Sequence, residues 1–299
     1  MRINPDITPN ILADLQQSQS TLNTALQQVA TGRSVNVPSD NPGASATMVQ
    51  NTIETGDVDQ YTKNIGTVLA SVESASSVLS SVVKSLTQAV SLGTEGASGT
   101  TNTFNLQAIA TQVQGLLATV VSQANASAAG GYLFGGSSTS IPYTADSSSP
   151  AGYTYNGNAN ETSVAVGDSL NVQINLPGSQ IFSDPSNNVL GALSSLVTAL
   201  QSGNSVSISS ATNSISSAIA FIGQQQGFYG NAEEQLNSQD TFLQQETVTL
   251  ASQTTNLAGV DLATAAANLS QAETDNSAAL AATAKVLPNT LLSYLSAPS

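Results

Sequence analysis

The stretch ILADLQQSQSTLNTALQQVATG, residues 11–32, decides the fold class. Its apolar or small positions alternate in steps of four and three, through Ile11, Leu15, Ser18, Leu22, Ala25 with Leu26, and Val29. This spacing is typical of a helix that packs one face along another helix, and it also suits an ordinary amphipathic core helix. Gly32 follows the stripe and can end a helix in the left-handed conformation. The stretch therefore predicts a helix that ends at residue 31.

A second stripe with the same spacing lies near the other end, in VDLATAAANLSQAETDNSAALAATAKV, residues 260–286. We expect Pro288 to interrupt this helix, because proline clashes with the preceding turn. If the two stripes pair, the two ends of the chain come together and the middle lies furthest away. The stripe runs through Leu262, Ala265, Leu269, Ala272, Asn276, Ala279, Thr283 and Val286.

The segments between the two stripes are also mainly helical. Residues 32–44 carry two prolines and two glycines, which predicts an ordered loop with a new helix starting near Pro42. Helical periodicity then continues to Val90. A Gly/Thr/Ser turn is expected at residues 93–103, followed by a helix over Leu106–Val121 that would make an antiparallel hairpin. Helical periodicity returns at 189–200 and again at 208–250.

The middle of the chain has a different character. Most of the seven tyrosines lie in or near residues 130–155, and residues 162–166 and 170–176 alternate polar and apolar side chains, as half-buried strands do. Gly167-Asp168 between them reads as a hairpin turn. We therefore predict a mainly α protein: a long antiparallel helical rod or coiled coil formed by the N- and C-terminal segments, with a small β-rich insert. The expected domains are terminal helices (1–42 and 258–299), a helical rod (43–136 and 187–257) and a β-rich outer domain (137–186).

Composition excludes several classes of function. Only 8% of the residues are charged and the net charge is -14, so a phosphate backbone or an anionic membrane surface is a poor partner. The N-terminus has no apolar core of a secretory signal peptide, and no apolar run approaches the roughly 20 residues needed to span a bilayer. We expect neither nucleic acid nor membrane as a partner.

The sequence offers little material for catalysis. With no His and no Cys, Ser-His-Asp and Cys-His sites and the usual zinc sites cannot form. Glu233-Glu234 is best explained as a solvated helix face, and Glu54, Asp57 and Asp59 lack the spacing of a calcium loop. The glycine-rich residues 130–136 lack the Lys-Ser/Thr pair of a phosphate loop, so we interpret them as a turn that packs its aromatic side chains. We predict no enzyme activity, no cofactor and no metal.

Five motifs carry a family resemblance. LQQVATGRSVNVPSDNPGA (26–44) resembles the N-terminal signature of the flagellin superfamily, and LAGVDLATA (257–265) resembles its C-terminal block. GYLFGG (131–136), YNGN (155–158) and the closing LLSYL (291–295) are more similar to the branch that joins the flagellar hook to the filament. Asn41 and the segment LAGV (257–260) depart from the usual acidic residues of this pattern.

The resemblance implies a structural protein of the bacterial flagellum, outside the cell. Such a chain would be exported unfolded by the flagellar type III system, without a cleaved signal peptide, and its ends would be disordered until assembly. The implied partners are further copies of the chain in a helical layer, hook-associated protein 1, flagellin, and an export chaperone that binds the C-terminal region. A filament flagellin is the alternative. An enzyme on a flagellar scaffold and a non-flagellar helical secreted protein are further alternatives.

Two sets of candidate residues follow. The predicted assembly interface comprises Ile11, Leu15, Leu22, Leu26, Val29, Leu262, Leu269, Ala272, Ala279, Val286, Leu291, Leu292, Tyr294 and Leu295. The resemblance assigns turn and packing roles to Gly32, Arg33, Pro38, Ser39, Asp40, Pro42, Tyr132, Leu133, Phe134, Gly135, Gly136, Tyr155, Gly157 and Asp261.

Overall fold

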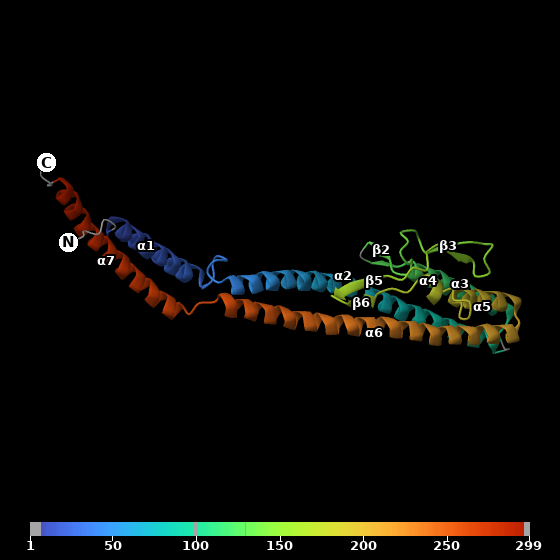
Figure 1. Ribbon diagram of the computed structural model, residues 1–299. Helices are drawn as coiled ribbons and strands as arrows, with labels where there is room; N and C mark the ends of the chain where they lie inside the picture. The colour runs from blue at the N-terminus through green and yellow to red at the C-terminus, as the bar shows by residue number, and fades with distance from the viewer. Residues whose placement is uncertain (1–6, 99–100, 129, 296–299) are drawn as a thin grey trace. The chain divides into compact units, whose positions relative to one another are not determined.

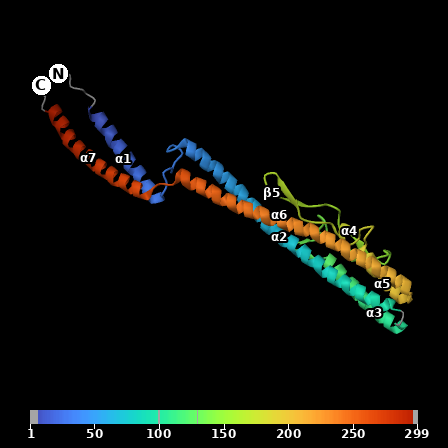
Figure 2. The same cartoon turned by 90° about the horizontal axis from the view of Figure 1, so that it is seen from below.

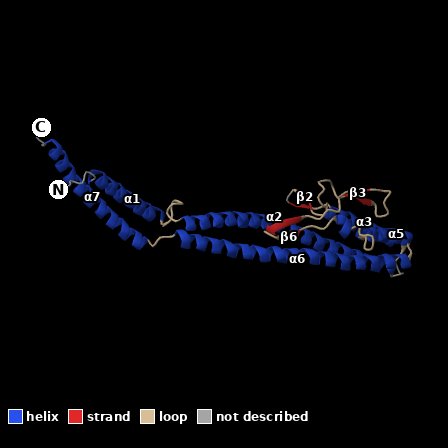
Figure 3. Cartoon of the chain, viewed as in Figure 1, coloured by secondary structure: helices blue, strands red, loops and turns tan. Residues whose placement is uncertain are grey.

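Long helices dominate the computed structural model, and a small insert holds the strands (Figure 3). The structure describes residues 7–98, 101–128 and 130–295, and side chains within residues 10–285 of these ranges. The chain divides into two units: unit 1 holds residues 1–57 and 246–299, and unit 2 holds residues 58–245. The predicted fold class, mainly α with a small antiparallel insert, is confirmed.

Unit 1 is built around two helices from opposite ends of the sequence. Helix α1 (Ile7–Thr31) and helix α7 (Leu262–Leu295) lie side by side in both views (Figures 1 and 2). The start of α2 (Pro42–Ala97) and the end of α6 (Ser205–Ala258) complete the unit, joined by a hydrogen bond from Asn51 Nδ2 to Thr254 Oγ1 at 3.3 Å. The predicted end of the first helix at Thr31 and the start of the second at Pro42 are confirmed.

One prediction about α7 is wrong. Pro288 does not interrupt the helix, which continues to Leu295. A proline lacks only its own N–H, so a helix that runs through it gives up one backbone hydrogen bond and takes a local kink. Proline therefore does not always end a helix, as the sequence analysis assumed for Pro288.

Unit 2 is a bundle made by the rest of α2, α3 (Thr103–Ala124), α5 (Val189–Ser202) and the first part of α6. Helices α3 and α5 pack directly on each other. The core is made mainly of branched aliphatic side chains; its fully buried members include Val72, Leu79, Leu86, Val113, Val120, Leu193, Leu196, Ile208, Ile215, Ile222 and Leu236.

The predicted turn at residues 93–103 is too long, because α2 continues to Ala97. Two glycines inside this last stretch permit close helix packing. A Cβ at Gly93 would collide with Thr212 Oγ1 of α6, and a Cβ at Gly96 would lie 2.5 Å from Leu200 Cδ2 of α5. The glycines that looked like a turn are therefore contact points between helices.

The insert between α3 and α5 consists of three two-stranded antiparallel hairpins. The strands are β1 (Ser127–Ala128) with β2 (Gly131–Tyr132), β3 (Tyr143–Ala145) with β4 (Tyr153–Tyr155), and β5 (Ser163–Gly167) with β6 (Leu170–Gln173). The short helix α4 (Gly178–Ile181) follows. The hairpin predicted at Gly167-Asp168 is confirmed, while the strands begin at Ser127, ten residues before the insert was expected to start.

By length and composition alone, α2 is the one helix in the described part of the chain that could cross a membrane. The sequence analysis did not single it out. Val72, Leu79 and Leu86 of this helix are buried in unit 2. We therefore assign its apolar stripe to the core of the bundle.

Candidate assembly surface

The seam between α1 and α7 brings together seven of the fourteen predicted interface residues. Ile11, Leu15, Leu22 and Val29 of α1 are half-buried, as are Leu269 and Ala279 of α7. The best-buried side chains of the seam are alanines: Ala25, Ala265 and Ala272. The seam therefore buries little apolar surface per residue, and each helix keeps much of its circumference open.

Two predicted interface residues lie outside this seam. Leu26 is 45% exposed and Leu262 is 58% exposed, and the neighbouring Leu12 and Leu280 are exposed as well. The stripe pattern placed Leu26 beside Ala25, but only one of two adjacent residues can face the partner helix. Val286, Leu291, Leu292, Tyr294 and Leu295 lie outside the residues whose side chains the structure describes.

The loop after α1 ties the N- and C-terminal segments together. Gly32 has φ of 66° and its N–H donates to Gln28 O at 2.9 Å, so glycine ends α1 as predicted. Arg33 forms an isolated antiparallel bridge with Gly259. The N–H of Ser34 donates to Ala258 O at 2.6 Å, and the N–H of Val260 donates to Gly32 O at 3.1 Å.

Asp40 holds this loop in shape. Its Oδ2 accepts the N–H groups of Asn36 and Val37, each at 2.9 Å. These two hydrogen bonds, that from Val37 first, lower the pKa of the Asp40 carboxyl below its usual value. Pro38 and Ser39 are exposed, and Pro42 is the first residue of α2.

Two side chains cap the helices that follow the bridged segments. Asn41 Oδ1 accepts the N–H of Ala44 at 3.0 Å at the start of α2. Asp261 Oδ1 accepts the N–H of Ala263 at 2.9 Å at the start of α7. The sequence analysis noted Asn41 only as a departure from the family; the structure shows that it serves as the N-cap of α2.

The glycine-rich motif of the insert packs its aromatic side chain as predicted. Phe134 is fully buried, with its ring centroid 5.2 Å from that of Phe182 in an edge-to-face arrangement. Tyr155 donates its hydroxyl to Phe134 O at 2.9 Å. Tyr132 and Leu133 are half-buried.

Three glycines of the insert leave room for close contacts. Gly136 has φ of 69°, and a Cβ there would collide with Asn158 Oδ1. A Cβ at Gly157 would collide with the Tyr155 hydroxyl. Gly135 is buried, and a Cβ there would lie 3.1 Å from Ser138 O. The motif residues therefore build one packed corner.

Sequence reasoning missed two residues that fasten the insert to the helices. Asn125 at the end of α3 accepts the N–H of Tyr143 at 2.7 Å and donates to Tyr143 O at 2.8 Å. The hydroxyl of Tyr229 in α6 accepts the N–H of Leu176 at 3.1 Å. No periodic pattern marks these positions, because each is a single polar side chain that forms hydrogen bonds to the backbone of the insert.

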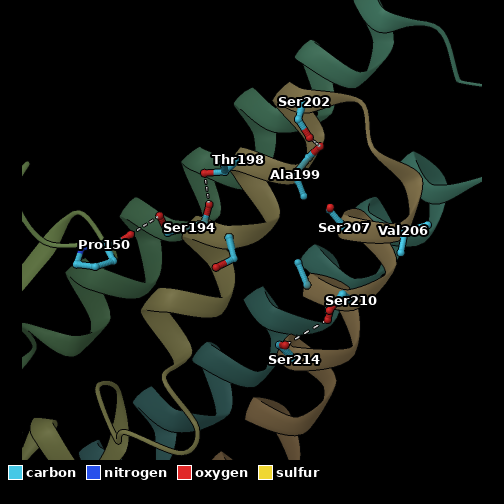
Figure 4. Close-up of a pocket in the computed structure, with 11 residues that line it drawn as sticks. Pro150, Ser194, Thr198, Ala199, Ser202, Val206, Ser207, Ser210 and Ser214 are labelled. Carbon is cyan, nitrogen blue, oxygen red and sulfur yellow. Dashed lines mark hydrogen bonds between the residues drawn. The ribbon is translucent and has the colours of Figure 1, made fainter.

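A groove between α5 and α6 is lined mainly by serine and threonine (Figure 4). Ser194 donates to Pro150 O, Thr198 to Ser194 O and Ser202 to Ala199 O. No acidic or basic side chain lines this groove. Across the described residues, no three Asp or Glu side chains gather closely enough to hold a metal ion.

Comparison with known proteins gives the family. The model of the bacterial flagellin N-terminal helical region matches residues 7–139, and that of the bacterial flagellin C-terminal helical region matches residues 212–295. A comparison with curated protein sequences gave no match.

Solved structures share the fold. A structure assigned to a flagellar hook-associated protein of Vibrio parahaemolyticus superposes with a TM-score of 0.67 at 20% identity, covering 74% of this chain and 100% of that one. FlgL of Bacillus cereus gives 0.60 at 23% identity, covering 69% and 99%. The flagellar junction protein FlgL of Legionella pneumophila gives 0.61 at 14% identity, covering 71% and 100%.

The two family models together cover well over half of the chain, including both helices of the α1–α7 seam. The chain therefore belongs to the bacterial flagellin family.

Proposed function

We propose that this protein is the structural adaptor that joins the flagellar hook to the filament. The observation that carries the proposal is the combination of flagellin-type ends with a fold shared, over 69–74% of this chain, by a flagellar hook-associated protein, FlgL and the flagellar junction protein FlgL. Membership of a flagellar structural family supports a role without catalysis.

Unit 1 carries features typical of a region that packs against other subunits. Its seam is rich in alanine, and large apolar side chains stay exposed around it: Leu12, Leu26, Val37, Val49, Ile53, Val248, Leu262 and Leu280. Exposed apolar side chains in this number suit contacts with neighbouring copies. Heterologous contacts without closing symmetry build helical arrays.

The remaining parts of the proposal follow from this role. The partners would be hook-associated protein 1 below the layer and flagellin above it, with an export chaperone on the C-terminal region before assembly. The protein would lie outside the cell and leave it unfolded through the flagellar type III system. The terminal helices (1–42 and 258–299) would then order on assembly, as weak isolated helices do when they find partners. The rod (43–136 and 187–257) and the outer domain (137–186) would fold beforehand.

Immunogold electron microscopy of intact flagella tests the position directly. An antibody against residues 140–186 is expected to label one narrow zone between hook and filament. Label along the whole filament would mean that the protein is a filament flagellin, the second candidate, which shares the same terminal regions.

Truncation tests the assembly role of the C-terminal helix. Removal of residues 262–299 is expected to abolish assembly and leave a soluble protein; a truncated chain that still polymerises would refute the role. A finer test replaces two exposed leucines, Leu26→Ser with Leu262→Ser, and compares this variant with Leu170→Ser in unit 2. All three side chains are exposed, so only the loss of subunit contacts should separate the variants.

A further inference from the structure

The α1–α7 seam can be resolved into layers. The bridge between Arg33 and Gly259 sets the antiparallel direction. Outward from this bridge, the stripe of α1 and the stripe of α7 both step by four, three, four, three and four residues. The layers that result are Val29 with Ala265, Ala25 with Leu269, Leu22 with Ala272, Ser18 with Asn276, Leu15 with Ala279, and Ile11 with Thr283.

Most of these layers pair a large apolar side chain with a small one. Leu22 and Leu15 meet alanines, and Leu269 meets Ala25, as close packing requires. Ser18 with Asn276 is the exception, since both side chains are polar. One groove is lined by residues within 17–28 of α1 and within 268–275 of α7, so these two stretches lie beside each other, next to this layer.

The two polar groups of this layer differ from several threonine hydroxyls of the same helices. Thr21, Thr24 and Thr31 of α1 each donate to the carbonyl four residues earlier. Thr283 of α7 does the same, to Ala279 O at 2.8 Å. Ser18 Oγ and Asn276 Oδ1 are buried atoms that have no hydrogen-bond partner in the part of the chain that the structure describes.

We propose that Ser18 and Asn276 form a single polar layer that keeps the α1–α7 pair weak, so that the two helices separate more easily than their stripes alone would allow. A buried polar group without a partner opposes folding, because it loses its hydrogen bonds to water. Polar residues at one seam position lower the stability of helix pairs in this way. The inference concerns this seam alone and does not depend on the place of the protein in the flagellum.

Hydrogen exchange of the full-length protein, read by mass spectrometry on peptides from α1 and α7, tests the inference. In Ser18→Ala with Asn276→Ala, the polar layer is removed. Ser18→Leu with Asn276→Ala goes further, because it continues the Leu–Ala layers on either side. Both double variants are expected to slow exchange in α1 and α7 at least about tenfold, with the leucine variant slower than the alanine variant.

The matched control is Ser20→Ala with Asn268→Ala, because it makes the same two replacements on the same helices at exposed positions. It reproduces the gain in helix propensity that alanine brings. Equal exchange in the control and in both layer variants would overturn the inference. Exchange at the rate of an unfolded peptide in every variant would overturn it as well, since the polar layer would then not be what limits the pair.

Discussion

The two units are both helical, yet their cores differ in kind. In unit 2, side chains such as Leu79, Leu196 and Ile215 are fully buried, and aromatic rings fill the corner where the insert meets the helices. In unit 1, the best-buried positions of α1 and α7 are alanines, and the leucines of the seam stay half-exposed. A fully buried leucine contributes far more apolar surface than an alanine, so we expect unit 2 to fold by itself and unit 1 to depend on partners.

We expect this difference to matter for assembly. A unit with a well-filled core keeps its shape. A unit with a thin core can change its packing when new surfaces arrive. Low local stability is typical of segments that order on binding.

The largest expected difference between the two units comes from the same Leu→Ala substitution in each core. Leu79→Ala in unit 2 is expected to lower the free energy of unfolding by about 2–5 kcal/mol, because it opens a cavity in a packed core. Leu22→Ala in the α1–α7 seam should cost only about half as much, since Leu22 is half-buried already. Chemical denaturation followed by circular dichroism measures the first loss, and hydrogen exchange in α1 measures the second. Equal losses would contradict the difference between the cores.

High pH is expected to loosen unit 2 through its buried phenols. Burial raises the pKa of Tyr229 to about 12, and it raises the pKa of Tyr143 as well. A raised pKa means that the stabilisation is present below pH 10, the value for an unfolded chain, and is lost as pH rises towards 12. Tyr229→Phe should remove part of this loss, at a cost of about 1–3 kcal/mol at neutral pH because the N–H of Leu176 loses its acceptor. An unfolding titration from pH 9 to 12, with and without the substitution, checks both statements.

Glycines of α2 offer a matched test of how tightly unit 2 is packed. Gly93→Ala should destabilise by about 1–3 kcal/mol, because the new Cβ meets Thr212 and Leu196. Gly66→Ala in the same helix should stabilise by about 1 kcal/mol, since nothing lies within 4 Å of its Cβ and alanine is the better helix former. Thermal unfolding of the two variants should therefore shift in opposite directions. Shifts of the same sign would mean that packing around Gly93 can relax.

Local signals in the sequence predicted the elements well. The alternating stripe and Gly32 gave the end of α1, Pro42 gave the first residue of α2, and Gly167-Asp168 gave the last hairpin. Each of these features depends on residues close together in the chain. The same holds for the burial of Phe134 within its glycine-rich motif.

Features that depend on distant partners were not predictable. Gly93 and Gly96 were predicted to lie in a turn, because no local pattern shows that helices α5 and α6 come close to them. Leu26 and Leu262 read as seam residues, although the geometry of the pair leaves both exposed. Asn125 bonds to both backbone groups of Tyr143 and Tyr229 accepts the N–H of Leu176, and neither contact produces a periodic pattern.

Low pH is expected to destabilise one loop in each unit. The hydroxyl and N–H of Ser148 and the hydroxyl of Thr154 lower the pKa of Asp146 in unit 2 to about 2. In unit 1, the N–H groups of Val37 and Asn36 lower the pKa of Asp40. A lowered pKa means that each carboxylate stabilises its loop above about pH 4, the unfolded value, and that this contribution disappears as pH falls through the folded value.

Asp146→Asn and Asp40→Asn should each abolish the pH dependence of hydrogen exchange in their own loop and leave the other loop unchanged. Because unit 1 has the thinner core, the Asp40 substitution is expected to spread further, into the ends of α1 and α7, whereas that of Asp146 stays within the hairpin. Exchange measured between pH 2 and 6 on both variants would show whether a small local loss propagates only where the core is weak.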